Sequence, residues 1–424
     1  MEILCRDNSL FSNSNYICLR PSLIKCIGVS FVALGILLGN ILYDFLGKGI
    51  NYANLFMALG VLFIIDYKNL FSFKFPSFKK IMLFPLFLQI YILLAFLLSD
   101  STKIASMDSK FTDLFYILFI ILLIIALSSN EKNLCWDNAI YPLFYISTII
   151  VFLAVFKIIS TNDYNFSNRF VFESGGDPLT FGIGLSICLI SFLLIKPRIF
   201  FEKILKLCDL IFLVICEMAF QSRTGLLACT IVLIFYIFIL IRLNNMNKLK
   251  IIKILLILFF VILIICIIVS NNPFLKSIFE NLFNFAKRGL FTFFGDSSNG
   301  VDASAAERII YRKRAFEIIN SSNFFELLFG NGYMTMYVDI PILQAFLDLG
   351  FIGFLLYFSV VIFYPLYNII SYKKYKNIKT KNKNQWLIFS FMAFLAISKQ
   401  LSSALPYGHD VYWGSVFCIY FCSI

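Results

Sequence analysis

Arginines that lie between apolar runs carry the strongest chemical signal in this sequence. Arg169 is in a polar strip between two such runs, Arg223 stands at the junction of two others, and Arg308 and Arg312 lie in a long polar segment. A guanidinium group binds phosphate through paired hydrogen bonds and keeps its charge throughout the physiological pH range. The arginines therefore predict a site for an anionic, phosphate-bearing substrate.

Carboxyl side chains accompany these arginines. Asp339 lies near the end of the long polar segment, and Glu173 and Asp177 share the strip that contains Arg169. Fixed cations stabilise the negative charge that develops on a diphosphate leaving group. A carboxylate beside them can take the proton from an attacking hydroxyl, which makes Asp339 the candidate base, with Asp177 and Glu173 as rivals. Helix N-capping is the structural alternative for Asp339 and Asp177.

A helix is expected within the long polar segment, residues 271–344. Ser304 and Glu307 have the spacing of a capping box, which predicts a helix from Ala305 to about residue 320. The helix carries an apolar stripe that would rest on the membrane surface or on other helices, formed by Ala305, Ile309 and Phe316. After the helix, the pattern Gly330-Asn331-Gly332 permits positive φ angles and close backbone approach, which also suits a plain helix C-cap and turn.

The arginines of this helix have two interpretations. Arg308 and Arg312 are one turn apart and share a face beside the stripe, whereas Arg314 points away from them. Such a face can bind a phosphate-bearing substrate, or it can meet lipid head groups as interfacial amphipathic helices commonly do. Arg223 is similarly either functional, because an arginine close to hydrocarbon is costly, or a side chain that reaches the interface.

Membrane helices are the elements that must position these residues. Hydrophobic residues make up 60% of the 424 residues and charged residues only 14%, whereas a soluble domain has about 25% charged residues. The apolar runs are continuous rather than alternating, which excludes a transmembrane β-barrel and indicates an all-α polytopic membrane protein. We expect about twelve transmembrane helices. Their predicted positions are 23–43, 51–66, 81–98, 112–128, 138–160, 179–195, 204–220, 224–241, 251–270, 345–368, 385–403 and 411–424.

Basic residues gather in alternate connections between these helices, and the strongest cluster is at 371–384. The positive-inside rule places those connections and both termini in the cytoplasm. The polar segment then forms one long, partly helical outer loop, and shorter outer segments lie at 99–111, 161–178 and 220–223. These predictions divide the chain into N-terminal membrane helices, the outer loop with its amphipathic helix, and C-terminal membrane helices, at 1–270, 271–344 and 345–424.

Composition and residue spacing exclude several other classes of protein. The net charge of +12 reflects topology in a membrane protein, so no nucleic-acid partner is expected. The 11 cysteines form no CxxC pair and lie mostly in apolar runs, where cysteine behaves as a small hydrophobic residue. With His409 as the single histidine, the sequence predicts neither a metal site nor a cofactor. No disulfide is expected in the outer loop.

Taken in chain order, these motifs resemble the O-antigen polymerase/ligase superfamily of bacterial envelope assembly. The resemblance covers roughly the second half of the chain, and the order and membrane placement of the motifs make it specific. It rests on Arg169 with Asp177-Pro178, Ser222-Arg223-Thr224-Gly225, Arg308 with Tyr311 and Ala315, Leu328 to Gly332, and Asp339 to Leu343 running into Leu349-Gly350-Phe351-Ile352-Gly353. It implies a GT-C-like fold and a metal-independent glycosyltransferase that needs no cofactor.

The resemblance also implies the reaction and its place. Donor and acceptor are glycans carried on undecaprenyl diphosphate, joined at the periplasmic face of a bacterial inner membrane, so the outer loop is periplasmic. The implied catalytic residues are Asp339, Arg308 and Arg223. The implied substrate-binding residues are Arg169, Arg312, Asp177, Arg314 and Glu173. Membrane lipid and a chain-length regulator are the further expected partners.

Two related activities remain as alternatives. Ligases of the superfamily carry a histidine–asparagine pair just before the equivalent of the tenth span, where this chain reads Val338-Asp339-Ile340. That difference favours a polymerase, which lengthens the glycan, over a ligase, which moves a finished glycan onto lipid A core, and it leaves the identity of the general base open. A flippase or transporter of the lipid-linked unit is the other alternative, and Lys399 within the eleventh span suits it best. A structural scaffold fits the loop arginines poorly.

Overall fold

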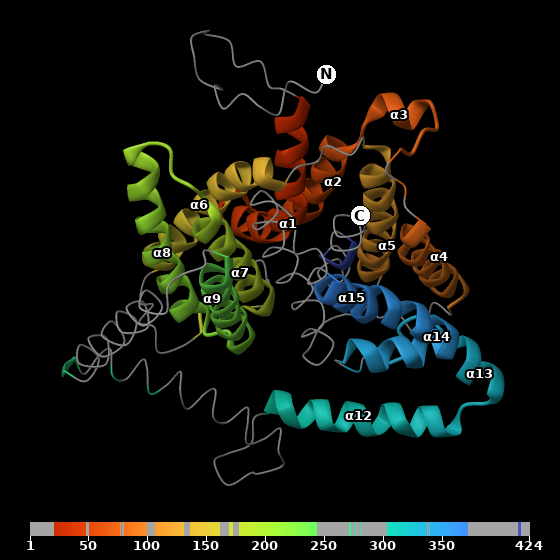
Figure 1. Ribbon diagram of the computed structural model, residues 1–424. Helices are drawn as coiled ribbons and strands as arrows, with labels where there is room; N and C mark the ends of the chain where they lie inside the picture. Colours follow the sequence, from red (N-terminus) through yellow and green to blue (C-terminus); the bar gives the residue numbers. More distant parts are fainter. Residues whose placement is uncertain are drawn as a thin grey trace.

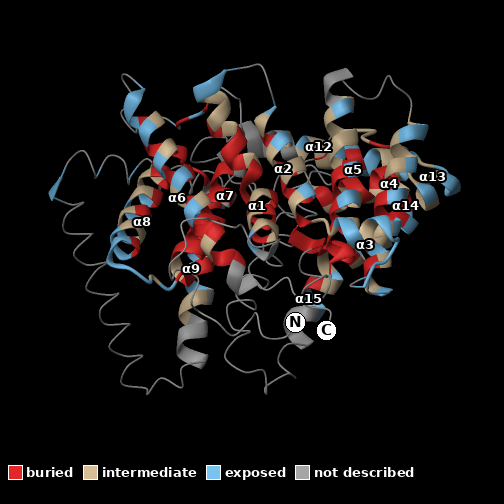
Figure 2. Cartoon of the chain, turned by 90° about the horizontal axis from the view of Figure 1, so that it is seen from above, coloured by how far each residue is buried: buried red, intermediate tan, exposed pale blue. Residues whose placement is uncertain are grey.

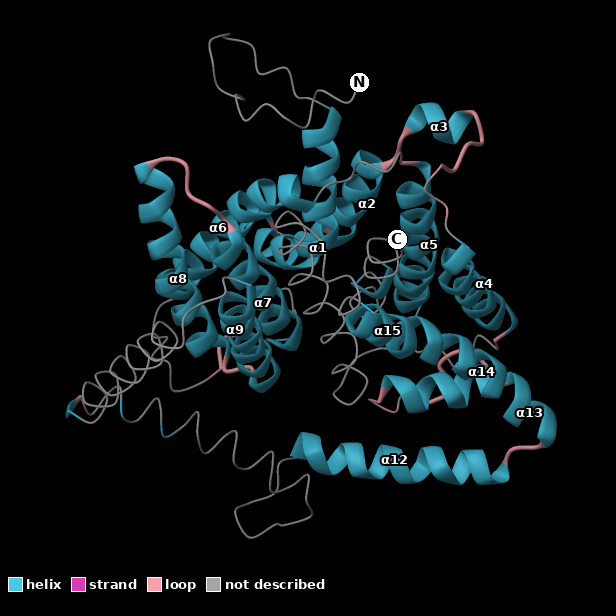
Figure 3. Ribbon diagram, viewed as in Figure 1, coloured by secondary structure: helices cyan, strands magenta, loops and turns pink. Residues whose placement is uncertain are grey.

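The computed structural model of this chain is built from helices and their connections (Figures 1 and 3). It describes residues 21–47, 51–76, 78, 80–99, 107–130, 136–161, 169–172, 178–243, 271–272, 276, 280, 303–336, 338, 340–371 and 414–416. No strand occurs among these residues, so the described part of the chain is all-α, as predicted.

The helices follow the predicted apolar runs. In chain order they are α1 (Pro21–Leu46), α2 (Tyr52–Ile64), α3 (Tyr67–Phe71), the 3-10 turn η2 (Lys80–Met82), α4 (Leu83–Leu98), α5 (Met107–Ser129), α6 (Trp136–Ser160), α7 (Pro178–Leu194), α8 (Phe200–Phe220), α9 (Arg223–Leu243), α12 (Ala303–Ser321), α13 (Phe324–Phe329), α14 (Pro341–Phe358), the π-helical η4 (Ser359–Phe363) and α15 (Tyr364–Ser371).

A membrane-embedded protein is supported by the length and composition of these helices. Among the described residues, 5 segments are long and apolar enough to cross a bilayer: Leu23–Leu46, Lys80–Leu98, Lys110–Ser129, Ala139–Ser160 and Pro341–Tyr367. Shorter apolar segments lie in α2, α7 and α9. The predicted spans at 251–270 and 385–403, and most of 411–424, are outside the described residues. The full number of spans therefore stays a prediction.

Exposed apolar side chains show where lipid would cover the protein. On α6 an exposed stripe follows the helical repeat, with Ile149, Phe152, Phe156 and Ile159 between 52% and 75% exposed. Figure 2 shows buried residues on the opposite faces, where the helices meet. Water would disfavour such a continuous apolar stripe, whereas hydrocarbon would not, so the stripe fits a lipid-facing surface.

Small residues set how closely the helices approach. The helices α1 and α2 pack against each other, and a Cβ atom on Gly28 would lie only 2.7 Å from the carbonyl oxygen of Gly60. Further contacts join α1 to α6 and α7, α7 to α9, and α14 to α4 and α13. Close backbone approach through small residues is a common basis of helix association in membranes, where the hydrophobic effect between helices is absent.

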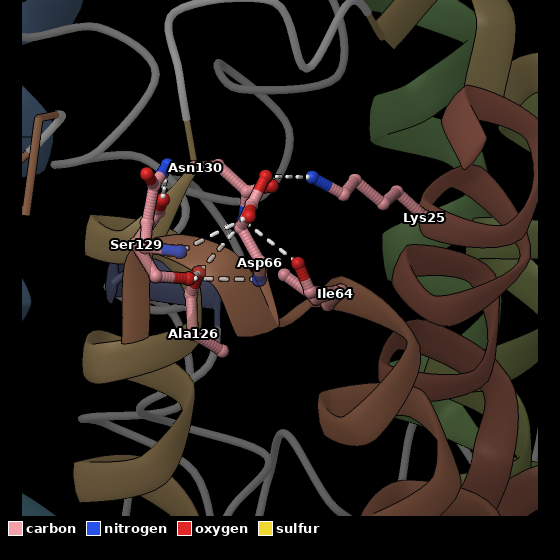
Figure 4. Close-up of polar contacts among 7 residues, drawn as sticks. Lys25, Ile64, Asp66, Ala126, Ser129 and Asn130 are labelled. Atoms are coloured by element: carbon pink, nitrogen blue, oxygen red, sulfur yellow. Dashed lines mark hydrogen bonds and ion pairs between the residues drawn. The ribbon is translucent and has the colours of Figure 1, made fainter. Parts of the chain in front are cut away.

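A polar corner at Asp66 holds the ends of α1, α2 and α5 together (Figure 4). The ammonium group of Lys25 pairs with the Asp66 carboxylate at 2.9 Å, and the Asp66 N–H donates to Ser129 Oγ at 3.0 Å. Asn130 Nδ2 donates to the Ile64 carbonyl at 2.8 Å, which satisfies the last turn of α2. Connections that the sequence predicts to be cytoplasmic therefore meet at one end of the bundle. Which side of a membrane that end faces stays a prediction from charge.

We expect the Lys25–Asp66 pair to make stability depend on pH. Burial alone would raise the pKa of Asp66, but the hydrogen bond and charge of Lys25 and the N–H groups of Asn69 and Lys68 outweigh it, so the net effect lowers the pKa. A carboxyl whose pKa is lowered by folding stabilises the protein at pH values above its unfolded pKa, which is about 3.9. This stabilisation is lost as the pH falls through the pKa of the folded state. For a partly exposed pair the contribution is up to about 1 kcal/mol.

Asp66→Asn should therefore melt at a lower temperature than the wild type at pH 7, with the gap closing toward pH 3. Thermal unfolding in detergent across this range measures the gap, and Lys25→Met is the matched variant that should lose the same stabilisation at pH 7. A gap that is constant over the whole range would contradict the assigned role of the pair.

Candidate functional site

The helix α14 is broken near its middle at Gly350, whose φ of 66° and ψ of −168° are not helical. A break leaves the carbonyl groups of the preceding turn without their intrahelical donors. At membrane depth such groups need other partners within the protein, because hydrocarbon offers none. The break therefore demands donors from another segment.

The turn after α13 supplies those donors. The Asn331 N–H donates to the Leu347 carbonyl at 2.9 Å, and the Gly332 N–H donates to the Asp348 carbonyl at 3.2 Å. The next carbonyl, that of Leu349, accepts from the Tyr91 hydroxyl of α4 at 3.2 Å. The freed carbonyls of α14 are thus satisfied by the turn and by α4.

Glycines allow the turn and the broken helix to touch. A Cβ atom on Gly350 would lie 2.4 Å from the backbone nitrogen of Gly330, and one on Gly330 would lie 2.1 Å from the Asp348 carbonyl oxygen. Gly330 and Gly332 have φ values of 93° and 102°. The predicted positive φ angles and close backbone approach at these glycines are confirmed, and Gly330 is also the C-cap of α13.

Buried polar side chains fix the rest of the turn against α14. The carboxylate of Asp348, which is 0% exposed, accepts from the Thr335 N–H at 3.2 Å and from Gln344 Nε2 at 2.9 Å. The amide oxygen of Gln344 accepts from the Val338 N–H at 2.8 Å. These bonds join Thr335 and Val338 of the turn to α14.

Tyr333 links this turn to two more helices. Its N–H donates to Ser99 Oγ of α4 at 2.6 Å, and its phenol is hydrogen-bonded to the Asp113 carboxyl of α5. Its ring makes an edge contact with Phe96, with the centroids 5.2 Å apart. Burial, followed by the nearby charges of Asp113 and Asp348, raises the pKa of Tyr333 far above its ordinary value. The phenol therefore keeps its proton and acts as a donor.

The helix α12 packs onto the end of this turn (Figure 1). Ala315 is buried with Val338 of the turn and Leu347 of α14. Arg308 and Arg312 are seven and three residues before Ala315, so their positions lie on the same face of α12. The helical repeat therefore places the positions of Arg308 and Arg312 on the face of α12 that packs against Val338.

Some details of α12 differ from the sequence prediction. The helix packs on the protein through Ala315, Ile318 and Ile319, whereas Phe316 of the predicted stripe is 54% exposed, which agrees with the membrane-surface alternative for that residue. A small residue permits closer approach of two backbones than a phenylalanine does. The helix begins at Ala303, so Ser304 lies inside it rather than at its N-cap. Arg314 is exposed and away from the packed face, as predicted.

Arg169 lies at a different part of the protein, beside the turn between α8 and α9. Its Nε donates to the Phe220 carbonyl at 3.1 Å and its Nη2 to the Gln221 carbonyl at 3.3 Å. The next residue, Phe170, donates its N–H to the Ala219 carbonyl at 2.8 Å. A guanidinium at the C-terminus of a helix is also favoured by the helix dipole. Arg169 thus ends α8 and lies next to the turn that leads to Arg223.

The α8–α9 turn is as tight as predicted. Gln221 adopts the left-handed conformation with φ 47°, and Ser222 caps α9 by accepting from the Gly225 N–H at 3.1 Å. A Cβ atom on Gly182 of α7 would lie 2.7 Å from the Gly225 Cα atom. Ser222 and Gly225 therefore have structural roles on either side of Arg223.

Several predicted site residues are outside what the structure describes. These are Asp339, Glu173 and Asp177, the side chains of Arg223 and Arg308, and Lys399. The helix α14 has Pro341 in its first turn as predicted, but its N-cap is Ile340 rather than Asp339, because a proline at the first helical position makes the residue before it the cap. The backbone positions of the arginines fall in two places. Arg308 and Arg312 are on α12, and Arg169 and Arg223 are at the α8–α9 turn.

Carboxyls on apolar helices, most of them buried, are the functional candidates that the sequence interpretation missed. Asp113 and Asp348 flank Tyr333. On α8, Glu202 and Asp209 accept hydrogen bonds from Tyr145 at 2.9 Å and Thr148 at 2.7 Å, both on α6. Acidic residues inside apolar runs were the available signal, since ionisable groups within membrane helices are costly and commonly functional.

Arginines, carboxyls and a phenol are the residue types that anion binding and proton transfer use. Among the described residues, no group of three or more His, Cys, Asp and Glu side chains is placed to hold a metal ion. Comparisons with known protein families, with curated proteins and with solved structures found no match. The functional argument therefore rests on this chain's own residues.

The break at Gly350 gives a direct test of the architecture. Gly350→Ala adds the cost of a left-handed alanine and a clash with the Gly330 backbone, together about 3 kcal/mol or more. Gly47→Ala is the matched control, because Gly47 has φ 92° but nothing within 4 Å of the added Cβ atom, so it costs only about 1 kcal/mol. Melting temperatures in detergent measure both, and equal losses would contradict the described contact.

Proposed function

We propose that this protein is an O-antigen polymerase, a glycosyltransferase that joins undecaprenyl-diphosphate-linked repeat units at the periplasmic face of a bacterial inner membrane. The growing glycan chain is the donor, and a hydroxyl of a new lipid-linked unit is the acceptor. The proposal draws on the resemblance of the motifs and on the chemistry of the candidate site. A membrane helix bundle suits a substrate whose lipid stays in the bilayer.

One observation carries the proposal: the face of α12 on which the helical repeat places Arg308 and Arg312 packs, through Ala315, against the turn that precedes α14. Ala315 contacts Val338 there, and Arg308 and Arg312 share its face. Guanidinium groups at this place can hold a diphosphate and stabilise the charge that develops as it leaves. A membrane-surface helix that only met lipid head groups would not need this face to pack on the protein.

The remaining arginines have supporting roles in this proposal. Arg169 lies beside the turn that leads into Arg223, the first residue of α9. We assign diphosphate binding to Arg308 and Arg312 and contact with the lipid-linked acceptor to Arg169 and Arg223. A polymerase rather than a ligase is favoured because no histidine stands near Asp339.

A flippase or transporter of the lipid-linked unit is the second candidate. Broken helices and buried carboxyls are typical of transporters, and this protein has a break at Gly350 and acidic residues on α8. The carbonyls freed by the break, however, are bonded to Asn331, Gly332 and Tyr91 rather than open to a cargo. The polymerase is therefore the better-supported function.

Charge removal on α12 tests the proposal. Arg308→Ala should lower the rate of chain lengthening about 100-fold, as expected when one group that stabilises a developing anion is lost. Arg312→Ala should cause a smaller loss. Lys313→Ala is the matched control, because Lys313 is exposed on the same helix and away from the packed face, and its activity should equal that of the wild type.

The assay uses purified protein in nanodiscs with defined lipid-linked repeat units, and the product ladder is resolved by gel electrophoresis. A wild-type protein that never forms products longer than one repeat would overturn the polymerase. Transfer of a finished glycan to lipid A core would support the ligase, and movement of the unit across vesicles without lengthening would support the transporter.

A further inference from the structure

Two carboxyls flank the phenol of Tyr333, and only one of them is accessible. Both oxygens of Asp348 accept hydrogen bonds, from Thr335 and Gln344, and its side chain is 0% exposed. Asp113 is partly exposed, and Tyr333 is its hydrogen-bonding partner among the described residues. Asp348 is thus a structural carboxylate, whereas Asp113 is partly exposed and uses one described hydrogen bond, that with Tyr333.

Asp113 lies at the same end of the bundle as the candidate site. It is in the second turn of α5, and its partner Tyr333 is fixed to Ser99 at the end of α4. Five residues after Tyr333, Val338 packs against Ala315 of α12. The turn that contains Tyr333 and Val338 therefore contacts both the Asp113 carboxyl and the face of α12 that contains Ala315.

Tyr333 is built to hold the Asp113 carboxylate in one orientation. The phenol is buried, its ring is packed against Phe96, and its backbone is bonded to Ser99, so it has little freedom to move. A phenol that donates to one carboxylate oxygen leaves the second oxygen directed elsewhere. Orienting a base through a third group is a recurrent arrangement in acid–base catalysis.

We infer that Asp113 is the general base of glycan transfer and that Tyr333 is its positioning residue. The inference rests on the proposed function and deepens it, since the sequence pointed to Asp339 for this role. The sugar-chain acceptor is then bound with its reacting hydroxyl between α5 and the turn at residues 330–338.

The reaction balances as follows. The Asp113 carboxylate takes the proton from the acceptor hydroxyl, and the acceptor oxygen forms a bond to the anomeric carbon of the donor glycan. The bond between that carbon and the phosphate oxygen breaks, and its electron pair leaves with the polyprenyl diphosphate. The proton on Asp113 then passes to water or to the released diphosphate, which returns the carboxylate.

Kinetics of Asp113 and Tyr333 variants test the inference, in the same lipid-linked assay and with the melting temperature measured for each. Asp113→Asn should lower kcat at least about 100-fold with KM for the donor unchanged, the range for loss of a general base. Tyr333→Phe keeps the ring and should lower kcat less, again without a change in KM. Glu317→Gln, an exposed carboxyl of α12, is the control and should match the wild type.

Two further variants keep the test decisive if Asp113→Asn fails to fold. Asp113→Glu retains the charge but moves the carboxylate by one methylene, and should lower kcat at least about 10-fold, because small misplacements of a reacting group are costly. Asp113→Ala should regain part of its activity when formate is added, a rescue that a purely structural role would not allow.

The outcomes separate this inference from the proposed function. If Asp113→Asn keeps kcat within about fivefold of wild type while Arg308→Ala and Asp339→Asn abolish lengthening, the polymerase stands and the base is Asp339. A loss confined to KM, or Asp113→Ala that formate does not restore, also overturns the role of Asp113. If the wild type itself lengthens no glycan, the proposed function fails first.

Discussion

The hydrogen bonds between the 330–332 turn and the broken middle of α14 are the constraint on which the site depends. They give the freed carbonyls of Leu347 and Asp348 their partners, and without them unsatisfied groups would face hydrocarbon at a cost of several kcal/mol each. The same contact sets where residues 333–338 lie. Both the phenol of Tyr333 and the surface that receives α12 are positioned by this one backbone pairing.

Several polar groups elsewhere in the bundle also satisfy one another. The corner at Asp66 joins helix ends through an ion pair and amide hydrogen bonds, and the acidic residues Glu202 and Asp209 each accept from a hydroxyl of α6. Arg169 serves the end of α8 in a similar way. Asp113 differs from these groups because, among the described residues, its hydrogen-bonding partner is the phenol of Tyr333.

The positions of the described apolar helices could be predicted from the sequence because continuous apolar runs have few alternatives in a bilayer. The glycines at 330 and 332 were likewise readable, since close approach and positive φ angles need residues without a Cβ atom. Their partner at Gly350 was not, because the pairing arises only when α14 breaks. The contact of α12 through Ala315 was not predicted, because a single alanine beside arginines does not stand out in the sequence.

The partners of the freed α14 carbonyls lie at very different distances along the chain, and this affects the order in which the contacts can form during synthesis. The turn and the carbonyls it serves are fewer than twenty residues apart, and the turn leaves the ribosome first. Pairing between them closes a short loop, which costs little chain entropy and is quick. Tyr91, by contrast, joins Leu349 across 258 residues. During membrane insertion α14 can acquire its bent shape locally, and the contact with α4 then locks a hairpin that has already formed.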